Sequence, residues 1–107
     1  MNPSLQPYIK PAGIIKALAH PARLLLMNLL AKGPVCVCEL TAAVGYDIST
    51  VSLHLAVLKR AGLVTAEKNG NKVFYSLTCP CVLEFMTCIT QAACPGKPAA
   101  RKDRKHV

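Results

Sequence analysis

Acidic residues are scarce in this chain of 107 residues: five Asp and Glu stand against thirteen Lys and Arg, a formal net charge of +8. This imbalance favours an anionic partner. Long apolar runs are also missing, since no stretch approaches the roughly 20 apolar residues that span a bilayer. Residues 1–11, MNPSLQPYIKP, have prolines where a secretion signal needs an apolar stretch. We therefore expect a cytoplasmic protein with no membrane partner, built on one hydrophobic core.

Two motifs of thiol enzymes are absent as well. The six cysteines include no Cys-x-x-Cys redox pair, and no glycine-rich loop for a phosphate-like group is present. We therefore do not expect a reductase, a metal carrier or another enzyme. Without an export signal the thiols are expected in a reducing compartment, where they act as ligands, sensors or small core residues.

The positive charge is found in two places. Residues 95–107 hold five basic residues and one acidic residue, and they are too rich in proline and charge to fold alone, so we predict a basic disordered tail. The second place is the cluster of Lys59, Arg60, Lys68 and Lys72. A solvated surface explains such a cluster as readily as nucleic-acid binding does, so charge alone does not decide.

Helical patterns occupy the first two thirds of the chain. Apolar residues recur at helical spacing over residues 12–33, and Pro21 divides this stretch into two helices. A short helix is predicted within residues 38–46, and a longer one within 47–62, where Asp47 or Ser49 is the expected N-cap. Two short helices joined by a turn that contains glycine are typical of a helix-turn-helix.

A β-hairpin is predicted next, over residues 63–77, because apolar and polar residues alternate on both sides of Asn69 and Gly70. A basic hairpin that directly follows a helix-turn-helix is a wing. The expected fold is mainly α with a small β-hairpin: an N-terminal arm (1–11), a winged helix-turn-helix domain (12–94) and the tail (95–107).

The last predicted helix, within residues 79–94, has a narrow apolar stripe that little remaining chain can cover. We expect this helix to pack on a second subunit, at an interface that the first helix shares. The expected interface residues are Ile14, Ile15, Leu18, Val82, Phe85, Met86 and Ile89.

Four segments together resemble the ArsR/SmtB family of winged-helix metal-sensing repressors: KALAHPARLLLMNLL, CVCEL, STVSLHLAVLKRAGLV and NGNKVFYSL. The resemblance covers about residues 12–90 and is nearest to the arsenic-responsive members. It implies a homodimer on a palindromic DNA operator, with half-sites about one helical turn apart.

The start of the second helix of the helix-turn-helix is the expected DNA reader, because hydroxyls at such an end reach base edges in the major groove. The predicted contacts there are Ser49, Thr50, Ser52 and His54. Ser49 alternatively caps the helix, and His54 alternatively packs or contacts a phosphate. Lys59, Arg60, Lys68 and Lys72 are the predicted phosphate contacts.

In CVCEL the resemblance implies an inducer site, with Cys36 and Cys38 binding one thiophilic ion. Residues two apart in a regular helix point about 200° away from each other, so we expect both sulfurs to reach one ion only if the first helical turn distorts. That distortion would strain the neighbouring recognition helix and release DNA.

A third ligand is not evident beside this pair. The position where arsenic repressors often have a third cysteine is Thr41, and residues 1–35, from which cadmium and lead sensors recruit thiols, contain no cysteine. The third ligand is expected from the C-terminal cysteines, from a small thiol or from water; otherwise the site is two-coordinate.

Cys79, Cys81, Cys88 and Cys94 form the second cluster of thiols. The family's zinc sensors begin an inter-subunit site just after the last strand, and their Asp-x-His pair aligns with Cys79 and Cys81. Cys94 of the partner subunit would approach this pair in an antiparallel helix pair. Cys88, about 10 Å from Cys81 along the helix axis, is a weak candidate that equally suits core packing.

The expected function is therefore a repressor that binds its operator without metal and is released by As(III) or Sb(III). One alternative is a member of the same family that responds to Cd(II), Pb(II) or Zn(II). The other is a thiol-redox sensor, in which Cys36 pairs with a distant thiol because a Cys-x-Cys ring is strained.

Overall fold

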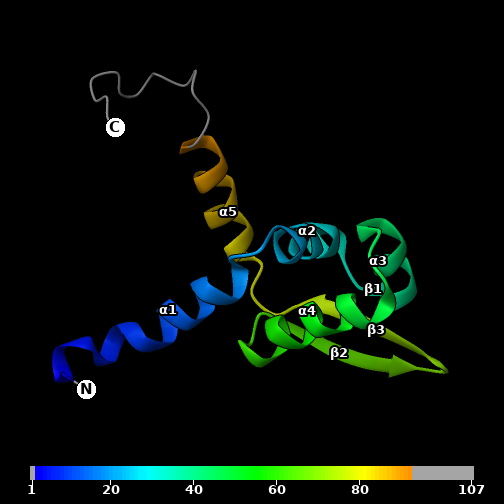
Figure 1. Cartoon of the computed structure of the whole chain (residues 1–107), viewed down its shortest axis with the longest axis horizontal. Helices are drawn as coiled ribbons and strands as arrows, with labels where there is room; N and C mark the ends of the chain where they lie inside the picture. The colour runs from blue at the N-terminus through cyan, green and yellow to red at the C-terminus, as the bar shows by residue number, and fades with distance from the viewer. Residues whose placement is uncertain (1, 93–107) are drawn as a thin grey trace.

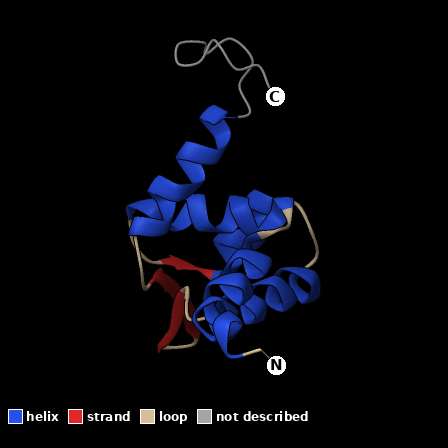
Figure 2. Ribbon diagram, turned by 90° about the vertical axis from the view of Figure 1, so that its left-hand side faces the viewer, coloured by secondary structure: helices blue, strands red, loops and turns tan. Residues whose placement is uncertain are grey.

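The computed structural model describes residues 2–92 and consists of helices packed beside a small antiparallel sheet. Figure 1 shows the helix-turn-helix above the long hairpin, and Figure 2 shows the strands gathered on one side of the helices. In chain order the elements are η1 (Pro3–Leu5), α1 (Gln6–Leu18), α2 (Pro21–Leu29), η2 (Leu30–Lys32), β1 (Val35–Cys36), α3 (Val37–Val44), α4 (Ile48–Arg60), β2 (Val64–Asn69), β3 (Lys72–Leu77) and α5 (Cys81–Ala92).

The boundaries of α2, α3 and α4 follow from local chemistry. Pro21 occupies the first turn of α2, where its missing N–H is not needed, and the Nδ1 atom of His20 accepts a hydrogen bond from the N–H of Ala22. Helix α3 ends at Gly45, whose φ of 85° lies in the left-handed region. Asp47, rather than Ser49, is the N-cap of α4.

Helix α1 begins earlier than the sequence pattern suggested. We expected residues 1–11 to form an arm, whereas the helix runs from Gln6 and includes Pro11 in its interior. The side chains of residues 2–13 are all exposed, so no buried face exists there to create an apolar pattern. The helical spacing of apolar residues therefore predicted only the second half of this helix, which packs against the core.

The hairpin forms as predicted, with Asn69 paired to Lys72 across a two-residue turn in which Gly70 has a φ of 70°. A third strand was not predicted. Strand β1 pairs antiparallel with β3, so that Cys36 lies opposite Phe74 and the strand order is β1-β3-β2. Two residues are too few for an alternation pattern to be read from sequence.

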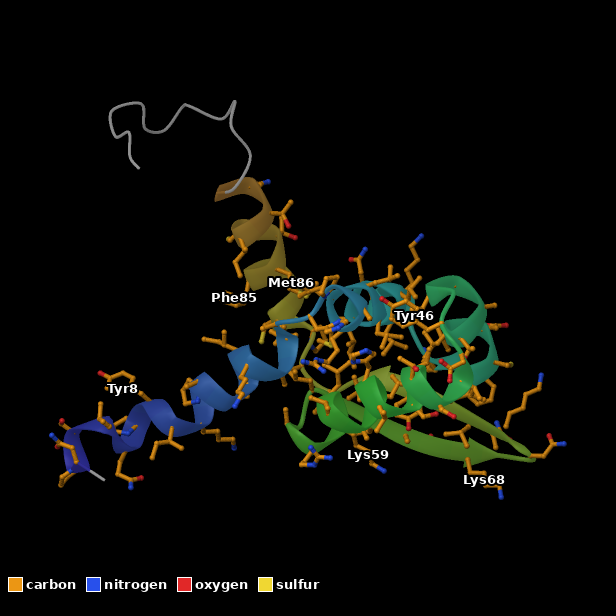
Figure 3. All side chains as sticks on the ribbon, viewed as in Figure 1. Tyr8, Tyr46, Lys59, Lys68, Phe85 and Met86 are labelled. Carbon is orange, nitrogen blue, oxygen red and sulfur yellow. The ribbon has the colours of Figure 1, made fainter. Side chains whose placement is uncertain are left out.

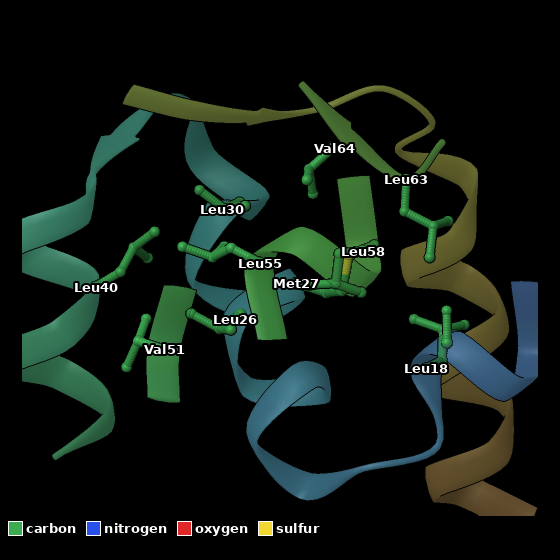
Figure 4. Packing of buried hydrophobic residues seen from close by; sticks show 11 residues of the cluster. Leu18, Leu26, Met27, Leu30, Leu40, Val51, Leu55, Leu58, Leu63 and Val64 are labelled. Atoms are coloured by element: carbon green, nitrogen blue, oxygen red, sulfur yellow. The ribbon is translucent and has the colours of Figure 1, made fainter. Parts of the chain in front are cut away.

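The core lies between α2, α3, α4 and the sheet (Figure 4). Val51, Leu55 and Leu58, the predicted apolar side of α4, are fully buried. The complete buried cluster is Ala17, Leu18, Leu26, Met27, Leu30, Leu40, Val51, Leu55, Leu58, Leu63 and Val64. This packing fixes the orientation of α4 relative to the wing.

Helices α1 and α5 extend away from this core (Figure 1). Among residues 2–92, no single helix is long and apolar enough to cross a membrane, and the two helix pairs of sufficient combined length are bent by 91° and 110°.

Candidate nucleic-acid interface and thiol site

The N-terminus of α4 presents two exposed serine hydroxyls, those of Ser49 and Ser52. Asp47 Oδ1 accepts a hydrogen bond from the Thr50 hydroxyl at 2.7 Å, and Asp47 Oδ2 accepts one from the Thr50 N–H at 3.3 Å. The Thr50 hydroxyl bond is the main reason that the pKa of Asp47 is lowered. Thr50 is thus engaged in the cap, whereas Ser49 and Ser52 are exposed. Of the four predicted base contacts, these two are the ones that face solvent without a cap partner.

His54 lies between helices rather than on the outer face of α4. Its Nδ1 atom is 3.1 Å from Arg23 Nη1, and its ring centroid is 4.3 Å from that of His20 and 6.4 Å from that of Tyr46. Since arginine only donates, His54 Nδ1 is the acceptor. Burial, and then the charges of His20 and Arg23, lower the pKa of His54. These contacts connect α4 to α2.

Sequence reasoning missed Arg23 and His20 as partners of His54. Arg23 and His54 are 31 positions apart, and no periodic pattern links residues at that separation. The Nε atom of Arg23 is also buried without a hydrogen-bond partner among the described residues.

The four predicted phosphate contacts are all exposed. Lys59 and Arg60 lie in the last turn of α4, and Lys68 and Lys72 lie on the two strands of the wing, close to its turn. Figure 3 shows Lys59 and Lys68 extending from the same side of the molecule. Lys72 of the wing lines the same groove as Ser52, whereas Lys59 and Arg60 lie at the other end of α4.

The thiols of Cys36 and Cys38 meet at a junction of two elements. Cys36 ends β1 and is the N-cap of α3, with extended backbone angles (φ −80°, ψ 155°), while Cys38 lies in the first helical turn. Their sulfurs are 2.8 Å apart. Our expectation that a distorted helix is needed to bring them together is therefore wrong: Cys36 precedes the helix, so the 200° separation of helical residues does not apply to it.

The two thiols have different environments. Cys36 is only 3% exposed, whereas Cys38 is exposed. The Cys38 thiol lowers the pKa of Cys36, and the backbone N–H of Glu39 acts in the same direction. Conversely, the contact with Cys36 raises the pKa of Cys38, although nearby Lys72 opposes the change. Within the pair, the pKa is thus lowered for the buried Cys36 thiol and raised for the exposed Cys38 thiol.

A groove of about 400 Å³ joins this pair to α4 and the wing. Its lining includes Ser52 of α4 and Lys72 of β3, two of the predicted DNA contacts. The full lining is Cys36, Val37, Cys38, Ile48, Ser52, Asn71, Lys72, Val73 and Tyr75. Ile48 and Asn71 were not predicted; each is separated from the thiols in sequence, and only the fold brings them together.

No group of three or more His, Cys, Asp or Glu side chains able to hold a metal occurs within residues 2–92. Thr41, at the position of a third cysteine in arsenic repressors, has a buried Oγ1 atom with no hydrogen-bond partner in that range. A third ligand for Cys36 and Cys38 is thus not supplied by the described part of one chain.

Cys79 and Cys81 form a second exposed pair, at the start of α5, with their sulfurs 3.8 Å apart. The neighbouring Cys81 thiol raises the pKa of Cys79. Cys88 is also exposed, on α5, so it does not serve as a core residue of this chain. Cys94, predicted to complete this site from a partner subunit, lies outside the described residues, as does the predicted basic tail.

Apolar side chains remain uncovered on α1 and α5. Ile15, Phe85 and Ile89 are 52%, 43% and 51% exposed, and a groove of about 290 Å³ runs between the two helices. The half-buried residues of the predicted interface are Ile14, Val82 and Met86. Leu18 differs from the other six: it is 5% exposed and belongs to the core of the single chain, because α1 meets the rest of the fold at its C-terminal end.

Taken together, a capped recognition helix, a preceding short helix and a basic hairpin define a winged helix-turn-helix DNA-binding protein. Comparison with known proteins agrees. Residues 20–66 match the family described as "Bacterial regulatory protein, arsR family". The chain is 40% identical over 80 residues to the uncharacterized HTH-type transcriptional regulator Rv0081 of Mycobacterium tuberculosis, covering 74% of this chain and 70% of that protein.

Two further relatives extend the comparison. A transcriptional repressor SmtB homolog of Synechocystis is 44% identical over 66 residues, which are 62% of this chain and 50% of the relative. The solution structure of the homodimeric winged helix-turn-helix domain Mb0332 of Mycobacterium bovis superposes with a TM-score of 0.76 at 26% identity, covering 100% of this chain and 96% of that chain. The chain belongs to the ArsR/SmtB family of transcriptional regulators, which are DNA-binding proteins rather than enzymes.

Proposed function

We propose that the protein is a homodimeric repressor that binds a palindromic operator when free of metal and is released when As(III) or Sb(III) binds to the thiolates of Cys36 and Cys38. One observation carries the proposal: these converged sulfurs line the same groove as Ser52 of the recognition helix and Lys72 of the wing. An ion held there acts directly beside both DNA-contacting elements. One of the C-terminal cysteines, a small thiol or water supplies the third ligand; otherwise the ion is two-coordinate.

The donor set suits a soft ion. Thiolate sulfur prefers thiophilic ions to hard cations, and Cys36 already has a lowered pKa. The response follows from thermodynamics, since an ion that binds the DNA-incompetent conformation more tightly shifts the equilibrium toward it. A coupling of about 1 to 3 kcal/mol changes operator affinity roughly 5- to 150-fold.

A test separates sensing from DNA binding. In Cys36→Ser or Cys38→Ser protein, we expect operator affinity without ion to stay within about twofold of wild type, and arsenite no longer to release DNA, because a hydroxyl is a poor ligand for a soft ion. Fluorescence anisotropy of a labelled operator during arsenite titration measures both quantities. Cys88→Ser is the matched control and should respond like wild type. Loss of ion-free DNA binding in the Cys36 or Cys38 variants would make the pair structural instead.

A second candidate inducer is a divalent ion, Cd(II), Pb(II) or Zn(II), at Cys79 and Cys81. The 3.8 Å separation of these sulfurs equals the separation that two bonds of about 2.3 Å make in a tetrahedral zinc site. Release of operator by these ions, abolished by Cys79→Ser and unaffected by Cys36→Ser, supports this candidate over arsenite. In the thiol-redox alternative, peroxide alone would release DNA and mass spectrometry would find a disulfide.

A further inference from the structure

A second groove, of about 490 Å³, lies between α1 and the C-terminal half of α4, and the thiol site takes no part in it. Its lining combines two kinds of residue. Five are apolar or lack a side chain: Gly13, Ile14, Ala17, Val57 and Ala61. The other four are cations, Lys10, Lys16, Arg23 and Arg60, and no acidic residue is among the lining residues.

The charged and apolar residues of the lining indicate which class of ligand the groove can bind. Grooves of this size that are mainly apolar with a few convergent polar groups are typical of small-molecule sites. The cations attract an anion, and the apolar floor stabilises a hydrocarbon body because its burial removes apolar surface from water. A DNA backbone, which is ionic along its whole length, would leave the apolar floor unused. The occupant is thus an amphiphile with one anionic head.

Arg23 gives this site a charge that is not already neutralised. Its Nη1 atom binds the neutral Nδ1 acceptor of His54, and its Nε atom has no hydrogen-bond partner among the described residues. Neither nitrogen contacts a carboxylate among the described residues, so the guanidinium is available to an anion in the groove. Lys10, Lys16 and Arg60 are exposed at the same groove.

We propose that the groove between α1 and α4 binds a small organic anion with an unbranched apolar tail, of the fatty carboxylate class. The carboxylate accepts hydrogen bonds from the lysines and arginines of the groove, and the tail lies against Ala17 and Val57, because Ile14 also belongs to the expected dimer interface. This is a binding site distinct from the thiol groove, so it constitutes a separate input to the protein.

The test is isothermal titration of the full-length protein with decanoate, below its micelle concentration. We expect saturable binding, with 1-decanol and acetate each binding at least about tenfold more weakly. The alcohol lacks the anionic head, and acetate lacks the apolar tail. Lys16→Gln should weaken decanoate binding about tenfold, while Lys32→Gln, which removes an exposed lysine outside the groove, should leave it within twofold.

A steric variant keeps the test independent of charge. A Cβ atom added at Gly13 meets no atom within 4 Å, so Gly13→Leu fits the fold and places its side chain in the groove. We expect it to abolish decanoate binding, with circular dichroism and sedimentation confirming that the variant is folded and assembled like wild type. Absence of decanoate binding to wild type, binding equal to that of 1-decanol, or unchanged binding in both variants would overturn the proposal. If decanoate does not bind and Lys16→Gln weakens operator affinity, the groove is a phosphate contact instead.

Discussion

His54, a histidine of the recognition helix α4, holds that helix against α2. His54 is placed against Arg23, His20 and Tyr46, all from segments that precede α4. Its neutral ring accepts the Arg23 hydrogen bond through Nδ1, and a protonated ring would present a second donor there and a like charge. The contact between α2 and α4 therefore depends on the protonation state of one side chain.

This dependence gives a prediction about stability and pH. Because the folded pKa of His54 lies below the ordinary value of about 6.5, the unfolded chain binds the proton more readily, so the contribution of neutral His54 is complete above about pH 6.5 and is lost as the pH falls through the lowered pKa. His54→Asn keeps an acceptor near Arg23 and does not titrate. We expect its melting temperature, followed by circular dichroism, to fall less between about pH 8 and pH 5 than that of wild type.

The matched control is His106→Gln, which removes a histidine outside the described residues and should retain the wild-type pH profile. A profile of His54→Asn parallel to that of wild type would show that the ring does not carry this pH dependence.

At the scale of elements, the sequence predicted the helices and strands that are long enough for an apolar pattern to repeat. It missed the two-residue strand β1. The helices of the helix-turn-helix and the hairpin were predicted because buried residues recur along them, as Val51, Leu55 and Leu58 do in α4. Strand β1 spans two residues and carries no such period. Its absence from the prediction also caused the error at Cys36, since a residue that ends a strand and caps a helix is not subject to helical geometry.

The candidate site was predictable in part for the same reason. Thiols and cations are visible as residue types, so the members of each set could be named from sequence. The partners of those residues, such as Arg23 for His54 or Ile48 and Asn71 for the thiol groove, come from distant segments. Only tertiary packing decides those contacts.

The wing has its own prediction. Lys68 and Lys72 are exposed on β2 and β3, near the turn, where each can neutralise a DNA phosphate. We expect Lys68→Gln and Lys72→Gln each to reduce the slope of log operator affinity against log salt by about 0.9, because each removes one phosphate contact. Fluorescence anisotropy at several salt concentrations measures the slope. Lys32→Gln, on η2, should not change it; a slope unaltered by either wing substitution would exclude the wing from the phosphate backbone.

At the scale of the whole molecule, two helices extend from a core that covers neither of them fully. Ile15 on α1 and Phe85 on α5 line one groove and are both exposed, whereas Val51, Leu55 and Leu58 of α4 are fully buried. The homodimeric relative Mb0332 superposes over the whole chain. Exposed apolar surface of this kind is typical of a protein–protein interface.

We therefore expect Ile15→Glu and Phe85→Glu to shift the protein from dimer to monomer. Each substitution places a carboxylate in an apolar contact, and removing that carboxylate from water on association costs free energy. Sedimentation equilibrium measures the change, with at least about a hundredfold weaker association expected for the double variant. Leu53→Glu is the matched control: Leu53 is 68% exposed on α4 and does not line the groove between α1 and α5, so its substitution should leave the dimer intact. A dimeric double variant would place the interface elsewhere.

The short distance between the Cys36 and Cys38 sulfurs affects the rate at which a ligand can bind to them. Since the two sulfurs lie 2.8 Å apart before any ligand is present, the first two bonds to a ligand require no folding or unwinding step. Capture would then proceed at a rate set by encounter and by exchange of the ligand's own coordinating groups. Differences in affinity between ligands would appear mainly in their dissociation rates. For the repressor function proposed above, this predicts prompt release of the operator, with the lifetime of the ligand-bound state setting how long the operator stays free.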